Sequence, residues 1–180
     1  MHSVCRIVLI AVTITALEFS AAAHGSAEPP DPVVSVQPSP QDSTYLIVSH
    51  QANLAEIISG TQAAREGTCA LVRTLGVQLV ADHTRLDAMG VAVAIPNLVP
   101  LPLRPNPDQA QQIWDTGLRI GRDFDMTWLR MQEDFHRQSL QAGARQLRFG
   151  TVEAVTALAR NAEPTIDHHL TLVREALEHC

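Results

Sequence analysis

The sequence predicts an all-α fold, a bundle of four helices, from three observations. Alanine and leucine dominate the 180-residue chain and aromatic residues make up only 4% of it, which suits helices better than a β-sandwich. Four segments place apolar residues at helical spacing, with glycines or prolines between them. No segment alternates as a strand does, and none is repeated. With 46% hydrophobic residues, a single domain of this length can bury a sizeable core.

The N-terminus has the features of a secretory signal peptide, expected over residues 1–27. Arg6 supplies the positive charge, residues 7–17 form a short apolar run, and small residues allow cleavage after Ala23 or Ala27. Glu18 interrupts the apolar run before it reaches the ~18 residues of a membrane span, and no later span is found. We therefore expect an exported protein, periplasmic or secreted, with no transmembrane span after cleavage.

A proline-rich linker and then the helical domain follow the signal. Residues 28–43 are rich in proline and small polar residues, so we expect a disordered linker, and residues 44–180 form the predicted bundle domain. The first helix is expected over 44–65. Gly67 breaks it, and a second helix is expected over 68–90, capped by Thr68 and ended by Gly90.

Five prolines within residues 91–107 exclude a continuous helix there. In an extended conformation these residues reach some 50 Å, whereas a 22-residue helix is about 33 Å long. The segment is therefore a candidate crossover that lets the third helix start at either end of the bundle. That helix is expected over 108–148, with a break near Gly117 or Gly121.

The last helix is expected over 152–178. Thr151 can cap it, and Pro164 should kink or restart it. If the crossover holds, Cys180 at its end lies beside Cys69 at the start of the second helix. The two can then form a disulfide, provided that their Cα atoms lie within about 7 Å. Otherwise each cysteine is a buried or reactive single thiol, or Cys180 joins two chains in a dimer.

Several polar residues fall on faces that should be interior. Asp82 lies at the centre of the apolar stripe of the second helix, with His83 at its edge. A carboxylate in a core needs a partner, so Asp82 is either a metal ligand or a hydrogen-bonded tie between helices. In the last helix, His169 flanks the apolar stripe and His168 points well outside it.

The run 125–140 contains Glu133-x-x-His136, the spacing of a metal-ligand pair. Glu133, however, falls opposite the apolar stripe and is expected to be solvated. Asp125 and His136 share a face that can meet a neighbouring helix. In the first helix, periodicity predicts an exposed Glu56, although the residue borders a seam of small residues that would allow an interior position.

Four stretches give the chain a resemblance to a known family. They are "ANLAEI" (52–57), "QLVADHT" (78–84), "GRDFDMTWL" (121–129) followed by His136, and "AEPTIDHHL" (162–170). In order and spacing they resemble a bacterial family of exported proteins of unknown function, often labelled outer membrane proteins, with a ferritin-like helical bundle. The resemblance spans about residues 44–178. It implies a ferritin-like fold and no secure enzymatic activity.

The resemblance also marks recurrent polar positions. These fall on Asn53, Glu56, Asp82, His83, Asp125, His136 and His169. It thereby implies an interior role for Glu56. The chain departs from the family's pattern at Phe135, where an acidic residue often stands, and at His50, where a small residue is usual.

Two functions remain after exclusions. A net charge of −6 argues against nucleic-acid binding, and the chain has no nucleophile elbow, zinc-protease motif or phosphate-binding loop. One hypothesis is a non-catalytic envelope or stress-related module whose buried Asp/His cluster fixes helix register. The alternative is a metal-binding protein holding one zinc, copper or iron ion, since a di-iron site would need a second Glu-x-x-His pair. The candidate ligands are Glu56, Asp82, His83, Asp125, His136 and His169.

Overall fold

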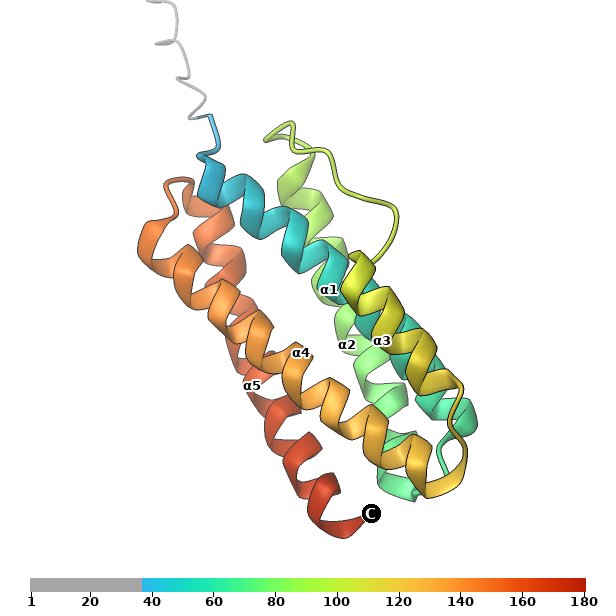
Figure 1. Ribbon diagram of the computed structural model, residues 1–180. Coiled ribbons are helices and arrows are strands. Elements are labelled where there is room, and N and C mark those ends of the chain that lie inside the picture. The colour runs from blue at the N-terminus through green and yellow to red at the C-terminus, as the bar shows by residue number, and fades with distance from the viewer. Residues whose placement is uncertain (1–36) are drawn as a thin grey trace, which may run out of the picture. The chain divides into compact units, whose positions relative to one another are not determined.

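The computed structural model describes residues 37–180, so the predicted signal peptide and residues 28–36 of the predicted linker lie outside the described part. The described residues form five helices and no strand, which confirms the all-α prediction (Figure 1). The helices are α1 (Pro40–Glu66), α2 (Ala70–Ala94), α3 (Pro107–Gly117), α4 (Gly121–Phe149) and α5 (Glu153–His179).

The four long helices pack side by side, α1 and α5 each contacting both α2 and α4, and the short α3 lies against α1 and α4. In Figure 1, α2 and α4 run in one direction and α1 and α5 in the other. The connection from the end of α2 to the start of α4 must therefore cross the length of the helices. Residues 95–106 and α3 make this crossing together, so the expected crossover is half extended chain and half helix.

Two helix boundaries differ from the prediction because tertiary or capping contacts outweigh a local signal. Helix α1 begins at Pro40, within the predicted linker, because Ser39 and Asp42 form a capping box. Helix α2 runs through Gly90, which is buried near Leu158, and ends only before Pro96.

The expected break in the third helix is confirmed, since α3 ends at Gly117 and α4 begins at Gly121. Gly121 has φ +61°, a conformation that residues with a Cβ rarely adopt. Helix α5 continues through Pro164 without a restart. Thr151 does not cap it; its backbone N–H and its hydroxyl donate instead to Asp42 at the start of α1.

Helices α1 and α2 approach each other closely at two glycines. A Cβ on Gly76 would lie 2.6 Å from the Gly60 carbonyl oxygen, and a Cβ on Gly60 would lie 2.8 Å from the Gly76 oxygen. Any larger side chain at either position would push the helices apart. This contact holds the middle of α1 against α2 and so positions the polar residues of both helices.

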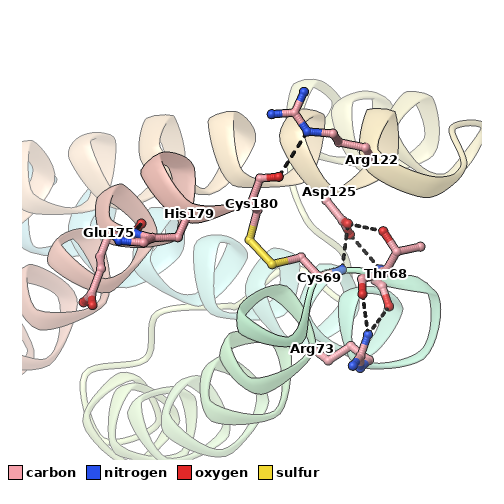
Figure 2. Close-up of a disulfide and its surroundings, with 9 residues drawn as sticks. Thr68, Cys69, Arg73, Arg122, Asp125, Glu175, His179 and Cys180 are labelled. Carbon is pink, nitrogen blue, oxygen red and sulfur yellow. Dashed lines mark hydrogen bonds between the residues drawn. A yellow bond between two sulfur atoms is a disulfide. The ribbon is translucent and has the colours of Figure 1, made fainter.

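A disulfide joins Cys69, just before α2, to Cys180 at the end of the chain, with the Cα atoms 5.8 Å apart (Figure 2). This confirms that the two cysteines lie at the same end of the helices. The alternative, a dimer through Cys180, would need the sulfur that this bond occupies. Nearby, Arg122 Nε donates to the Cys180 carbonyl oxygen at 3.1 Å and fastens the C-terminus to α4.

None of the helices in residues 37–180 is long and apolar enough to cross a membrane. Their buried apolar side chains form clusters along the helices, the largest around Phe124 and Trp128. On α2, a buried histidine, His83, stands between the buried Leu79 and Leu86. The core is thus interrupted by a polar site.

Candidate metal centre

Three histidines from three helices meet in the interior, and we call them the histidine cluster: His83 of α2, His136 of α4 and His169 of α5. Their exposed fractions are 2%, 1% and 0%. The ring centroids lie 5.4–5.6 Å apart, and one ring nitrogen of each lies within 4.8 Å of the others. Each ring faces inward because its neighbours one turn away, such as Leu79, Gln132 and Ile166, are buried.

Each ring has one nitrogen engaged by a hydrogen-bond acceptor on its outer side. The contacts are His83 Nδ1 to Asn53 Oδ1 (2.9 Å), His136 Nδ1 to the Gln132 carbonyl oxygen (2.8 Å) and His169 Nε2 to Asp82 Oδ2 (3.0 Å). Because these oxygens only accept, the ring nitrogen facing each of them must carry the hydrogen. In a neutral imidazole the second nitrogen then keeps its lone pair.

The second nitrogens are buried and have no hydrogen-bond partner among the described residues. They are His83 Nε2, His136 Nε2 and His169 Nδ1. Since the engaged nitrogens face outward, we infer that these three are the atoms that face one another. A buried polar atom left without a partner costs about 1–3 kcal/mol. One water molecule has only two hydrogens to donate, whereas one cation accepts three lone pairs.

Burial keeps the cluster uncharged at neutral pH. Desolvation lowers the pKa of His136 to about 4, although the hydrogen bond to the Gln132 carbonyl opposes the shift. Desolvation, with repulsion from the other two rings, lowers the pKa of His83 well below 6.5. Desolvation also lowers the pKa of His169, against the effect of Asp82. Neutral rings are the form that binds metals.

Glu56 lies beside the cluster, as the resemblance implied and periodicity did not. It is 1% exposed, and its Oε1 is 3.4 Å from His136 Nδ1. Desolvation raises the pKa of its carboxyl well above 4.5. Because burial also favours neutral His136, this contact joins two uncharged groups rather than an ion pair. In the orientation that satisfies both its atoms, the Gln132 amide donates to Glu56 Oε1 at 3.0 Å and accepts from Ser59 Oγ at 2.8 Å.

Asp82 lies on the outer side of His169 and is not among the groups that converge at the centre of the cluster. Its Oδ2 accepts from His169, while Oδ1 accepts from Arg85 Nη2 at 2.9 Å. Its side chain is 22% exposed, so it lies at the border of the interior and not at the centre of a buried stripe. A carboxylate that accepts a hydrogen bond from a ligand histidine orients the ring and makes it more basic.

The expectation that Asp125 converges with the histidines is wrong. Its carboxylate accepts the backbone N–H groups of Thr68 (2.9 Å) and Cys69 (2.8 Å) and also bonds the Thr68 hydroxyl (Figure 2). These donors belong to the residues just before α2. Backbone N–H groups at the start of a helix have no acceptor within the helix itself. Asp125 therefore caps α2 from α4, and Thr68, the expected cap, helps to hold it.

Two further residues lie outside the cluster as expected. Glu133 pairs with Arg174 at 3.0 Å, and His168 is exposed. Conversely, Gln132 was not among the candidate residues, although it lies on the same line of α4 as His136. Its position one turn before His136, on the same inward-facing side of α4, could have predicted from the sequence that Gln132 is buried near the cluster.

The donor set suits a transition-metal ion. Three neutral imidazoles are typical ligands of zinc, copper, iron or nickel, and three protein ligands leave a fourth position open in a tetrahedral site. Metal–nitrogen bonds of about 2.0–2.1 Å in that geometry place the nitrogens about 3.3 Å apart. From the spacing of up to 4.8 Å, the rings would close by at most about 1.5 Å.

The fold has a counterpart among solved structures. A crystal structure of a DUF305 fragment from Deinococcus radiodurans is 13% identical, with a TM-score of 0.71, over 81% of this chain and all of that one. At this identity the likeness concerns the fold alone. No curated protein matches the sequence. The model of a family described as a domain of unknown function, DUF4142, matches residues 27–176. Because that match covers most of the chain, the protein belongs to the DUF4142 family.

Proposed function

We propose that this domain binds one transition-metal ion through His83 Nε2, His136 Nε2 and His169 Nδ1. The observation that carries the proposal is a set of three buried nitrogens without partners in residues 37–180, on rings whose other nitrogen already has a hydrogen-bond partner. Metal sites commonly show this second layer of acceptors, which fixes the tautomer and the ring orientation. Zinc and copper(II) suit an all-imidazole site better than magnesium or calcium does.

Two nearby carboxyls can balance the charge of a divalent ion. Asp82 acts through the His169 ring, and Glu56 lies beside His136. A cation in the cluster would favour ionised Glu56, which is otherwise kept neutral by burial. Bound metal and the ionisation of Glu56 therefore support each other.

We further propose that the four long helices form a ferritin-like bundle and that the protein works outside the cytoplasm. A single long crossover between helices and a metal site in the bundle core are both features of ferritin-like folds. Export is supported by Arg6, the apolar run and the small-residue cleavage sites. An intact-mass measurement of the exported protein tests this, and a product retaining residues 1–5 would contradict it.

A non-catalytic envelope or stress-related module, with the cluster only fixing helix register, is the second candidate. The outward hydrogen bonds of the three rings favour it, because each ties two groups in place. Such a network works best when every polar atom is satisfied. The unpartnered nitrogens therefore make the metal site the better-supported function.

Metal binding to untagged, chelator-treated protein separates the two candidates. Zinc, copper(II) and iron(II) are titrated into wild type, His136→Ala and His168→Ala, with bound metal and melting temperature as readouts. We expect one ion per chain in wild type and His168→Ala, with a metal-dependent rise in melting temperature, and loss of both in His136→Ala. Wild type that binds none of the three metals, or His136→Ala that binds as wild type does, would leave the structural network as the function.

A further inference from the structure

A cavity of about 250 Å³ adjoins the histidine cluster, with His83 in its wall. Residues of α1, α2, α4 and α5 line it, together with Asn106 and Gln109 at the start of α3. On α1 the lining extends from Tyr45 to Asn53, and on α5 from Leu158 to Ile166. Eight residues of helix correspond to about 12 Å, so the cavity is elongated along the helices.

The chemistry of the wall selects the occupant. Of the residues that the structure describes, no Asp, Glu, Lys or Arg lines the cavity, so a charged molecule would lose its hydration without gaining a partner. Leu86, Phe135, Leu158 and Ile166 supply an apolar surface. The volume of the cavity is larger than that of a ~150 Å³ cavity known to take up benzene and smaller than that of most drug-binding sites.

Two polar groups in the wall can recognise an oxygen atom. Tyr45 is 4% exposed, and none of the side-chain hydrogen bonds within the described part of the chain involves its hydroxyl. Burial raises the pKa of Tyr45 to about 12, so the hydroxyl keeps its hydrogen and can donate it. Asn53 accepts from His83 through Oδ1, which leaves its amide nitrogen as a donor. The cavity also reaches solvent, since the exposed Val48 and Gln138 stand at its rim.

We propose that this cavity binds a small, elongated, uncharged molecule with an apolar chain and a hydrogen-bonding oxygen, such as a medium-chain alcohol. The ligand fills the space between the apolar walls, and its oxygen pairs with the Tyr45 hydroxyl or the Asn53 amide. Binding does not require a metal ion, so this site stands independently of the proposed metal centre. His83 belongs to both, which places a bound molecule next to the histidine cluster.

The test uses metal-free protein with 1-octanol as the probe and octanoate as its charged counterpart. We expect saturable binding of octanol in an NMR titration, with nuclear Overhauser contacts to the methyl groups of Leu86, Leu158 and Ile166. Octanoate at the same concentrations should not bind, because nothing in the wall compensates its charge. Equal binding of the two probes, or no saturable binding of octanol, would overturn the proposal.

Matched variants then locate the site. Ala162→Leu fills the cavity from α5, and Ala142→Leu fills it independently from α4 in case the first variant folds poorly. Ala154→Leu on the exposed face of α5 is the control. We expect both filling variants to lose octanol binding and the control to keep it. If either filling variant is folded and binds octanol as wild type does, the molecule binds elsewhere and the proposal is wrong.

Discussion

Acid should destabilise the metal-free domain through the histidine cluster, and His136 gives the magnitude. Its pKa is about 4 in the folded chain and 6.5 in the unfolded chain. Between these values the unfolded state binds a proton that the folded state does not, so stability falls as pH decreases. At about pH 5 the lost stability from this residue alone is about 2 kcal/mol, and it is close to zero at about pH 7.5.

Urea unfolding at these two pH values, with chelator present, measures the loss. Wild type should lose about 2 kcal/mol more than His136→Gln, which corresponds to a difference of about 1 M in the shift of the urea midpoint. Glu56 is present in both proteins and contributes with the opposite sign, so most of its contribution cancels in the comparison. His168→Ala, which changes an exposed neighbour of the cluster, should behave as wild type does. Equal pH dependence in wild type and His136→Gln would refute the reasoning.

Three other perturbations give separate outcomes. Replacing Cys69 and Cys180 by serine opens a loop with a separation of 111 residues, which should remove about 5 kcal/mol and lower the melting temperature by about 15 °C; a fall below about 3 °C would contradict this. Asp125→Ala should destabilise the domain by about 2 kcal/mol in urea and leave metal affinity unchanged, since the residue caps α2; a lost metal site would make it a ligand after all. The raised pKa of Glu56 means that the folded state keeps a proton which the unfolded state releases above pH 4.5, so stability falls as pH rises. Glu56→Gln should therefore stabilise the metal-free protein at about pH 8 while weakening metal binding, and a variant that binds metal more tightly would exclude the role in charge balance.

The three histidines could be predicted from the sequence because each lies on or beside the apolar face of its helix. Facial angle was sufficient for them, but it misled for Asp125. That residue shares a face with His136 and yet lies eleven residues away, about 16 Å along the helix axis. At that distance it reaches the start of α2 instead of the cluster. Side chains form one site only if they lie at the same level along the helix axes and also point in the same direction around them.

Other features depend on partners that no local pattern contains. Glu56 can be buried because the Gln132 amide of α4, itself bonded to Ser59 of α1, donates a hydrogen bond to its carboxyl. The pattern of apolar residues within α1 contains no information about this partner on α4. Gly90 and Pro164 are strong local breakers, yet α2 and α5 continue through them within the packed helices. The cavity is likewise a property of the assembled helices, since residues of all five helices in the described part line it.

Anomalous diffraction from crystals of the zinc-loaded protein tests the metal centre most directly, because it identifies the ion and the atoms that bind it. We expect one zinc ion per chain, bound by His83 Nε2, His136 Nε2 and His169 Nδ1, with the opposite nitrogen of each ring still bonded to Asn53, Gln132 or Asp82. An anomalous peak only at surface residues, or one bound through the opposite ring nitrogens, would contradict it.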